Sequence, residues 1–467
     1  MNPISLAEIG NVTGAAETSA ASDIAVPAIC TDTRRMAAGS LFIALHGENF
    51  DGHDFLDQAA AGGASAAMVD REPKTAPPAL RLLRVPDTKA AMGRLARHIR
   101  QQMRGKIIAV AGSNGKTGTK HLIHGVLRED LRGSMSPKSF NNDIGVPLTI
   151  FSADSMQDYL VLELGTNHPG EIRALTDIAL PDVAIVTNCS AEHLEGLGDL
   201  DGVRRENASL VEGIAPGGLL IVNGDDPALL EATGKFTGRR VKFGFSETND
   251  LWASNILCGL DGTNFRIEPL GKQAFVPLLG RHSAVNALAA IAVGRAMNLD
   301  DGRIVENMRH ATGPEMRLQL VNAGGVRVLN DAYNANPASM RAAIVTLLLL
   351  PASGRRIAML GDMRELGLSS AKLHREIGKL VADRFIPDLL VCVGAEAKAI
   401  AAEAIKTGMP PNRVEHFPNA AAACAVAARL RDGDLILLKA SRAIGLEAVA
   451  RAIVASRPSS PPLAAAS

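Results

Sequence analysis

The clearest pattern along the chain is an apolar run that passes through a glycine turn into helical spacing. Residues 107–111 (IIAVA) are all apolar, which is typical of a parallel strand buried on both faces. The turn GSNGKT at 112–117 follows, and apolar residues then recur at the spacing of one helix face over 122–127. A strand, a glycine turn and a helix in this order predict a loop that binds phosphate through its backbone N–H groups and the helix N-terminus.

The glycine turn also contains the side chains that a nucleotide phosphate loop uses. We expect Lys116 to reach the β- and γ-phosphates and the Thr117 hydroxyl to bind Mg²⁺. Val110 stands where the general pattern has its first glycine, so the loop is the shortened form GxxGKT. The alternative is an ordinary strand-to-helix turn with an incidental lysine, and the flanking strand and helix favour the phosphate loop.

Further apolar runs in this part of the chain end in polar residues. The run at 159–162 leads into Glu163, and the run at 183–186 leads into a polar loop that contains His193. Open parallel sheets bind ligands at the carboxyl ends of their strands. We therefore expect Glu163 to share a Mg²⁺ with Thr117, the alternative being a carboxylate that faces solvent. His193 is either a metal ligand or a structural histidine.

Other patterns predict the elements that follow. Alternating polar and apolar residues over 245–279 predict antiparallel strands, and 284–297 predicts a helix with Ser283 or His282 near its N-cap. In the last third of the chain, apolar strands alternate with helices, which indicates a second open α/β sheet. These strands are predicted at 326–329, 357–360, 389–393 and 435–439. Asn336 and Pro337 are predicted to cap and begin the helix after the first of them.

The first hundred residues carry a weaker pattern. It predicts a short helix over 5–10, a strand over 41–45, a helix with Phe55, Leu56 and Ala59 inward, and a second strand. The loop at 47–54 is dense in polar residues. This loop is either a solvated turn or an edge that reads a ligand.

Length and pattern together predict an α/β protein of three domains, since 467 residues exceed the roughly 150 typical of one domain. The expected domains are a small N-terminal α/β domain at 1–103 and a central phosphate-loop ATPase domain with a parallel sheet at 104–313. A C-terminal Rossmann-like α/β domain is expected at 314–456. The Pro- and Ser-rich tail 457–467 is expected to be disordered.

The balance of charged residues and the spacing of the cysteines limit the classes of function that the sequence fits. The 49 basic and 49 acidic residues balance, and aromatic residues make up 3%, which argues against a nucleic-acid or anionic-membrane surface. The five scattered cysteines are expected to be free thiols of a reducing compartment. The sequence shows neither a signal-peptide pattern nor an apolar run of about 18 residues. We expect a soluble, cytoplasmic protein.

Several stretches together resemble the Mur ligase family of peptidoglycan synthesis. They are AGSNGKT at 111–117, SFNNDIGVPLTI at 139–150, LELGTNHPGEI at 162–172, AEHLEGLG at 191–198, GRHSAVNALAA at 280–290, NDAYNANPASM at 330–340, LGDMRELG at 360–367 and KASR at 439–442. The first hundred residues add weaker matches, TDTR and GENFDGHDF, so the resemblance covers nearly the whole chain. The YNANP, GDMxELG and NNxIGVPLT stretches resemble the branch that uses D-alanyl-D-alanine.

This resemblance implies a reaction and its participants. ATP would phosphorylate the terminal carboxylate of UDP-N-acetylmuramoyl-tripeptide, and the amine of D-alanyl-D-alanine would attack the acyl phosphate to form an amide. ATP and Mg²⁺ are the implied cofactors, the N-terminal domain would bind the UDP end, and a monomer is expected. Because two anions must meet, cations and positioning should supply most of the catalysis.

The resemblance also implies roles for individual residues. Lys116, His193 and Lys439 are implied to be catalytic. The implied nucleotide contacts are Gly112, Ser113, Asn114, Gly115, Lys116, Thr117, Asn286, Arg317, Asp331, Asn334 and Asn336. One Mg²⁺ would be held by Thr117 and Glu163, and a second by His193. The implied contacts to the other substrates are Thr33, Arg34, Asn49, Gly52 and His53 at the UDP end, Asn141, Asn142, Thr166, Asn167 and His168 along the muramyl peptide, and Ser441 and Arg442 near the dipeptide.

One position departs from the family pattern. Many members carry a lysine there that is carbamylated and helps to hold the second Mg²⁺, whereas this chain has Asn207. Either the adjacent carboxylate of Glu206 supports the metal, or the second site is weaker. Other interpretations stay open: a sibling ligase or a folylpolyglutamate-type synthase, a phosphate-loop kinase or motor ATPase, and a non-catalytic nucleotide-binding homologue.

Overall fold

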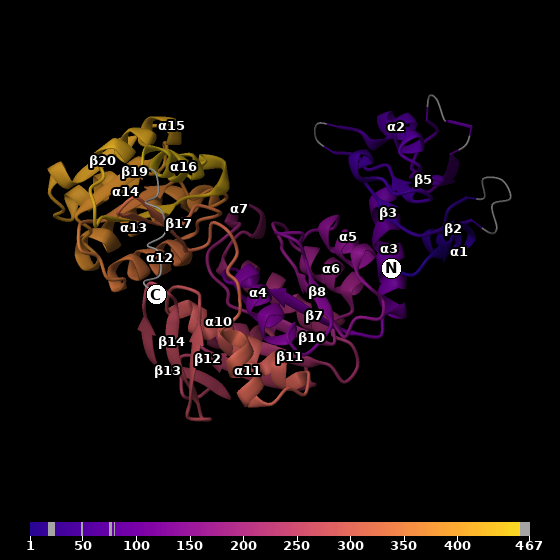
Figure 1. Cartoon of the computed structure of the whole chain (residues 1–467), viewed down its shortest axis with the longest axis horizontal. Coiled ribbons are helices and arrows are strands. Elements are labelled where there is room, and N and C mark those ends of the chain that lie inside the picture. The colour runs from indigo at the N-terminus through magenta and orange to yellow at the C-terminus, as the bar shows by residue number, and fades with distance from the viewer. Residues whose placement is uncertain (17–23, 48–49, 74–76, 79, 458–467) are drawn as a thin grey trace, which may run out of the picture.

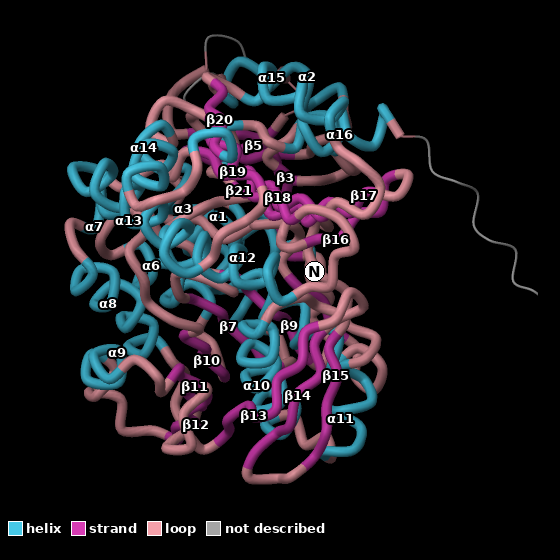
Figure 2. Tube along the Cα trace, turned by 90° about the vertical axis from the view of Figure 1, so that its left-hand side faces the viewer, coloured by secondary structure: helices cyan, strands magenta, loops and turns pink. Residues whose placement is uncertain are grey.

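The chain is built on three main sheets, each formed by one continuous stretch of sequence (Figure 1). The computed structural model describes the chain except residues 17–23, 48–49, 74–76, 79 and 458–467. The outer two sheets lie on either side of the central one, and helices flank all three (Figures 1 and 2). The predicted α/β architecture with three domains is therefore confirmed.

The N-terminal sheet has four parallel strands in the order β3-β4-β5-β6. Its elements are α1 (Leu6–Thr13), β3 (Ile29–Cys30), β4 (Leu41–Ile43), α2 (Leu56–Ala61), β5 (Ala66–Val69) and β6 (Arg81–Arg84), with a separate antiparallel pair β1 (Ile4–Ser5) and β2 (Ala25–Val26). The predicted helix near residue 5 begins after Ser5, whose hydroxyl accepts the Glu8 N–H at 3.1 Å. Leu56 and Ala59 point into the core as predicted, and Phe55 is half-buried.

The central sheet has nine strands in the order β15-β14-β13-β12-β11-β10-β7-β9-β8. The strands are β7 (Lys106–Ala111), β8 (Gly133–Met135), β9 (Tyr159–Glu163), β10 (Val183–Val186), β11 (Leu219–Asn223), β12 (Arg239–Gly244), β13 (Leu251–Cys258), β14 (Thr263–Glu268) and β15 (Lys272–Val276). All pairs from β8 to β13 are parallel, whereas β13, β14 and β15 pair antiparallel as their alternating pattern predicted.

Alternation along β7 explains how the central sheet is covered. Ile107 and Ala109 pack on the face covered by α3, α5 and α6, while Ile108 and Val110 pack on the face covered by α4, α10 and α11. The helices around this sheet are α3 (Thr88–Gln102), α4 (Lys116–Leu127), α5 (Gly145–Ser152), α6 (Glu171–Ala179), α7 (Leu194–Leu197), α8 (Leu200–Ala208), α9 (Pro227–Ala232), α10 (Arg281–Ala296) and α11 (Asp301–Met308). Because α3 also contacts α1, it joins the N-terminal and central domains.

The C-terminal sheet has six strands in the order β16-β17-β21-β18-β19-β20, with an antiparallel edge strand β16. Its strands are β16 (Gln319–Ala323), β17 (Val326–Asp331), β18 (Arg356–Gly361), β19 (Leu389–Val393), β20 (Val414–Phe417) and β21 (Leu435–Lys439). One face is covered by α12 (Pro337–Leu349), α13 (Ser370–Arg384) and α14 (Lys398–Lys406), and the other by α15 (Ala420–Ala423) and α16 (Glu447–Ser456).

The structure corrects one helix start and confirms another. Helix α10 begins at Arg281, three residues before the predicted start at 284, after the N-cap Gly280, whose φ of 90° suits glycine. His282 and Ser283 lie near the N-cap as predicted, but neither is the cap itself. The Ser283 hydroxyl instead donates to the Leu279 carbonyl from inside the first turn. Asn336 caps α12 as predicted, because its side chain accepts the Ser339 N–H at 2.8 Å.

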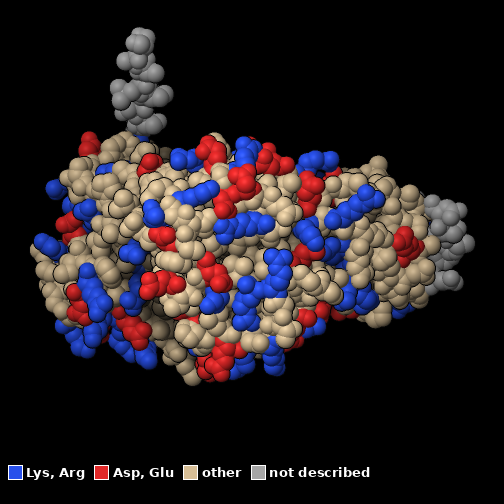
Figure 3. All heavy atoms as spheres, turned by 90° about the horizontal axis from the view of Figure 1, so that it is seen from below, with Lys and Arg blue, Asp and Glu red and all other residues tan. Residues whose placement is uncertain are grey.

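The distribution of surface charge and the length and polarity of the helices are relevant to the expected partners. Basic and acidic side chains are interspersed over the face shown in Figure 3, without a large area of one sign. Of the helices within the described residues, none is both long and apolar enough to cross a membrane.

Asp434 offers a test of how the C-terminal sheet is stabilised. Its buried carboxylate accepts the Arg355 guanidinium at 2.6 Å and the Arg431 N–H at 2.9 Å, where β18 and β21 begin. Burial raises the pKa of Asp434, but hydrogen bonds from Arg355 and Arg431 outweigh burial and leave the pKa below 3.8. Asp434→Asn is expected to lower the free energy of unfolding by about 1–3 kcal/mol at pH 7.

The lowered pKa of Asp434 determines how its contribution to stability changes with pH. The stabilisation is present above the unfolded pKa and is lost as pH falls through the folded one, so variant and parent should converge below about pH 4. Hydrogen exchange at β18 and β21 in urea measures the difference. The control is Asp432→Asn, because that exposed carboxylate pairs with Arg457 at the surface and should matter little. Equal effects of the two variants would contradict the prediction.

Candidate functional site

A cavity of about 1080 Å³ lies between the central and C-terminal domains. It is lined by residues that follow β7, β9 and β10 and by residues at the ends of β17 and β21, so the carboxyl edges of two parallel sheets face it. Sixteen of the expected site residues line it: Ser113, Asn114, Gly115, Lys116, Asn141, Asn142, Glu163, Thr166, Asn167, His193, Asn286, Arg317, Asp331, Asn334, Asn336 and Lys439.

The other expected site residues lie elsewhere. Ser441 and Arg442 line a smaller cavity of about 330 Å³, which shares His193, Asn334 and Asn336 with the large one. Gly112 and Thr117 belong to the phosphate loop and its helix, and His168 is exposed beside Glu171. Thr33, Arg34, Gly52 and His53 lie in the N-terminal domain, and Asn49 falls outside the described residues.

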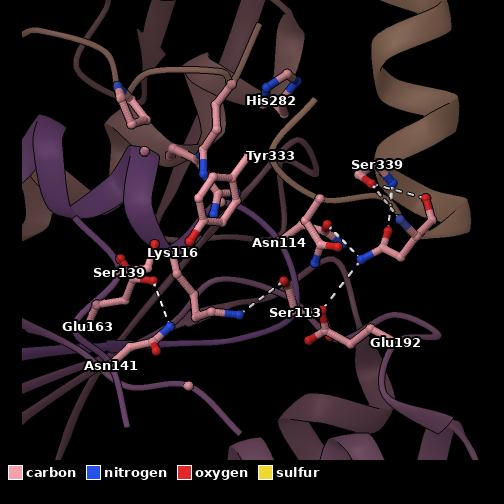
Figure 4. A pocket seen from close by; sticks show the side chains of 18 of the residues that line it. Ser113, Asn114, Lys116, Ser139, Asn141, Glu163, Glu192, His282, Tyr333 and Ser339 are labelled. Atoms are coloured by element: carbon pink, nitrogen blue, oxygen red, sulfur yellow. Dashed lines mark hydrogen bonds between the residues drawn. The ribbon is translucent and has the colours of Figure 1, made fainter. Parts of the chain in front are cut away.

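The phosphate loop needs glycine where helix α4 begins. Gly115 has a φ of 85°, and a Cβ there would come within 2.8 Å of the Asn286 side chain. The Lys116 ammonium folds back over the loop and donates to the carbonyls of Gly112 at 2.5 Å and Ser113 at 3.2 Å (Figure 4). Lys116 is therefore held over the surface where phosphate oxygens would bind.

Residues after β10 brace this loop, a role the sequence did not reveal. The Thr187 hydroxyl and the Asn188 amide both donate to the Asn114 carbonyl at 2.7 Å. The Asn188 side chain also accepts the Asn114 N–H at 3.1 Å. The only signal was their place at the end of a predicted strand beside the loop.

Thr117 and Glu163 fit a cation with oxygen ligands. The Thr117 hydroxyl is buried without a hydrogen-bond partner among the described residues, and one buried Glu163 oxygen is contacted there only by the Lys120 ammonium, at 3.1 Å. The other Glu163 oxygen accepts the Asn141 amide at 3.1 Å, which fixes the carboxylate (Figure 4). Hydroxyl and carboxylate oxygens are the ligands that Mg²⁺ prefers, so the donors match the expected ion.

Lys120 is the site residue that sequence reasoning missed most clearly. Its fully buried ammonium forms an ion pair with the Glu163 oxygen that Asn141 does not contact, at 3.1 Å. Burial lowers the pKa of Lys120. Burial raises the pKa of Glu163, but Lys120, Arg317 and Lys116 outweigh burial and leave that pKa below 4.5. The available signal was a lysine on the apolar face of α4, three residues after Thr117 and three before Ile123.

The C-terminal domain contributes two more cations. The buried Lys439 ammonium donates to Asp331 at 2.6 Å and to the Asn334 carbonyl at 3.0 Å. Burial lowers the pKa of Lys439, although Asp331 opposes this. Arg317 stacks on the Tyr333 ring, 4.4 Å from its centroid.

Two contacts join the domains across the cavity. The Asn336 amide donates to the Asn114 side chain at 2.9 Å, so the cap of α12 touches the phosphate loop. His193 Nδ1 bonds to the Glu365 carboxylate of the C-terminal domain. Glu192, next to His193, is buried on the wall of both cavities, and burial raises its pKa. A buried carboxylate with a raised pKa in a cavity is typical of functional sites, and its place beside His193 was the available signal.

Comparisons with known proteins agree with this geometry. Family models match three segments: "Mur ligase family, catalytic domain" at residues 26–100, "Mur ligase middle domain" at 110–294 and "Mur ligase, glutamate ligase domain" at 316–442. The UDP-N-acetylmuramoyl-tripeptide–D-alanyl-D-alanine ligase of Bacillus subtilis is 35% identical over 92% of this chain and 93% of its own. The chain belongs to the Mur ligase family.

Further relatives of this Mur ligase match it over similar lengths of chain. The Escherichia coli enzyme of the same name is 36% identical over 92% of this chain and 94% of its own. The crystal structure of MurF from Acinetobacter baumannii has a TM-score of 0.87 and 30% identity over 97% of this chain and 99% of that one. MurF ligase from Thermotoga maritima, solved in complex with ADP, has a TM-score of 0.81 and 25% identity over 92% of this chain and 97% of that one.

The position that departs from the Mur ligase pattern does not line either cavity. Asn207 is buried, and its amide donates to the Val203 carbonyl at 2.9 Å. The Glu206 carboxylate accepts the N–H groups of Gly170 and Ile172, each at 2.7 Å. Both Glu206 oxygens are therefore engaged at the start of α6, away from both cavities.

Lys120→Met tests the role of the missed lysine. Its loss removes the nearest cation from Glu163, so the pKa of Glu163 should rise. Binding of Mg²⁺ with ADP should then weaken roughly tenfold between pH 8 and pH 6, whereas the parent should change little. Isothermal titration calorimetry at the two pH values measures this change in affinity.

The control for this experiment is Lys106→Met, because Lys106 is an exposed lysine that pairs with Asp182. If Lys120→Met folds poorly, the double variant with Glu163→Gln should recover stability, since it leaves no unpaired buried charge. A flat pH profile for Lys120→Met would contradict the assigned role.

Proposed function

We propose that this Mur ligase joins D-alanyl-D-alanine to UDP-N-acetylmuramoyl-tripeptide, the two substrates in the names of its relatives, and that cleavage of ATP to ADP and phosphate drives the reaction. The observation that carries the proposal is the cavity in which a phosphate loop and a buried Lys439 from two domains face each other. The folylpolyglutamate synthase of Mycobacterium tuberculosis has a TM-score of 0.61 at 19% identity, a likeness of fold alone.

The residues around the cavity suit an acyl-phosphate mechanism. A carboxylate oxygen of the tripeptide attacks the γ-phosphorus of ATP, and ADP leaves. The dipeptide amine then attacks the acyl carbon, phosphate leaves, and the amine loses a proton. Negative charge builds up on the reacting groups in both steps. Lys116, Arg317 and Lys439 line the cavity and place three cations where they can stabilise this charge.

Mg²⁺ is proposed at the buried oxygens of Thr117 and Glu163, where it would neutralise charge on the nucleotide phosphates. His193 is proposed as a ligand of a second ion through Nε2, since its Nδ1 is held by Glu365. The carbonyl of Asn334 and the side chain of Asp331 fix the Lys439 ammonium beside the cavity.

The remaining substrate ends are assigned by position. The dipeptide is proposed to enter through the smaller cavity, where Arg442 and Ser441 meet His193. The UDP end is proposed to bind the N-terminal domain near Thr33 and Arg34. Lys89 of α3 lines the large cavity, so the cavity extends toward that domain. The proposed domain boundaries are 1–103, 104–313 and 314–456.

We further propose that the chain acts as a monomer in the cytoplasm. Every residue assigned to the nucleotide and metal sites comes from this one chain, so no second copy is needed to complete them. A cytoplasmic location suits the use of ATP and the five cysteines, all of them free thiols.

Phosphate release from ATP tests the proposed reaction. The purified chain should release phosphate only when UDP-N-acetylmuramoyl-tripeptide and D-alanyl-D-alanine are both present. L-alanyl-L-alanine is the matched control and should support little release. Release with another amine would keep the family and reject this acceptor, and no release with any pair would favour a non-catalytic homologue.

Substitutions at the two metal-related positions should differ in severity. Glu163→Ala removes a carboxylate that faces the cavity and is expected to lower kcat by about 100-fold or more. Asn207→Asp, which changes a residue behind the wall, should keep most of the activity per folded molecule. Steady-state rates at saturating Mg²⁺ make the comparison, with the exposed Asn412→Asp as control. Comparable losses in Glu163→Ala and Asn207→Asp would refute the ranking.

A further inference from the structure

A second cluster of metal-type side chains lies in the N-terminal domain, apart from the ATP cavity. His46 follows β4, His53 lies in the short 3₁₀ turn Gly52–Phe55, and Asp70 follows β5. Because β4 and β5 are parallel neighbours, their carboxyl ends bring these residues together. One Asp70 oxygen lies 3.3 Å from His46 Nε2 and 3.2 Å from His53 Nε2.

Both imidazoles are oriented by one outer carboxylate. Asp51 has one oxygen 2.7 Å from His53 Nδ1 and the other 3.3 Å from His46 Nδ1. A carboxylate on Nδ1 fixes the ring and leaves Nε2 as the ligand atom, which is the usual outer arrangement of histidine metal sites.

The surrounding donors indicate which nitrogen carries the proton. The backbone N–H of Asp70 points at His53 Nε2 at 3.3 Å, and the Arg71 guanidinium lies 3.0 Å from His46 Nε2. Both groups are donors only, so each Nε2 accepts and each Nδ1 carries hydrogen toward Asp51. Two imidazole nitrogens and a carboxylate oxygen therefore lie close together, and the Arg71 guanidinium beside them is the positive group that a metal ion would replace.

Two of the three separations between the ligand atoms match a tetrahedral ion. Bond lengths of about 2.0–2.1 Å at tetrahedral angles place ligand atoms about 3.3 Å apart, close to the two separations at Asp70. We propose that His46 Nε2, His53 Nε2 and an Asp70 oxygen bind a divalent transition-metal ion of the Zn²⁺ type. Such an ion ties the segment after β4 to the end of β5 and keeps a fourth position for water or a ligand.

Arg71 competes with the metal for this site. Its half-exposed guanidinium pairs with Asp51 and covers His46 Nε2, so it must turn toward solvent when an ion enters. Removal of this cation should tighten binding, which an ordinary surface site would not show. The proposal does not depend on the ligase reaction.

Zn²⁺ titration of the full chain tests the site. The metal-free protein is titrated calorimetrically in excess Mg²⁺, and Co²⁺ absorption reports tetrahedral histidine ligation. His46→Gln and Asp70→Asn should each weaken one Zn²⁺ site by at least about tenfold, and Arg71→Gln should tighten the same site several-fold. His310→Gln, at an exposed histidine far along the chain, is the control and should leave that site unchanged.

The proposal is overturned if the parent binds no more Zn²⁺ than His46→Gln does. That result is expected if a proton on one imidazole, rather than a metal, lies among the three acceptors. It is also overturned if Arg71→Gln weakens binding. Because His46 is half-exposed, its variant should fold, and thermal unfolding without metal checks this.

Discussion

The architecture of this Mur ligase depends on the way two parallel sheets present their carboxyl ends to one cavity. Parallel strands place every loop that follows them at the same edge, so residues distant in sequence meet there. In the central sheet this edge supplies the phosphate loop and Glu163, and in the C-terminal sheet it supplies Asp331 and Lys439. Helices flank both sheets (Figure 2).

The cations around the cavity are of two kinds, those paired with a carboxylate and those without such a partner among the described residues. Lys120 with Glu163 and Lys439 with Asp331 are buried cations that each have a carboxylate. Lys116 and Arg317, within the part of the chain described, form no ion pair: one folds over backbone carbonyls and the other stacks on Tyr333. A site built to receive two anions keeps some cations without carboxylate partners, since a paired cation has less to offer an incoming charge.

The contacts between domains involve functional residues directly. Asn336 caps helix α12 and also touches Asn114 of the phosphate loop, while His193 meets Glu365. Movement of one domain relative to the other would therefore change the surroundings of the loop and of His193 together. The phosphate loop and His193 are therefore both in direct contact with the C-terminal domain.

The sequence by itself determined several of the buried strands, the phosphate loop with Lys116 and Thr117, and the cap at Asn336, because these depend on local periodicity and turn chemistry. The ends of the predicted strands indicated Glu163 and His193 as candidates, and the family resemblance assigned roles to them and to Lys439. Only the tertiary structure showed that Lys120 faces Glu163, that Thr187 and Asn188 brace the loop, that Gly280 caps α10, and that His46, His53 and Asp70 converge. The reason is physical: burial, pairing and metal-type geometry depend on which strand ends become neighbours, and strand order is set by packing between segments far apart in the chain.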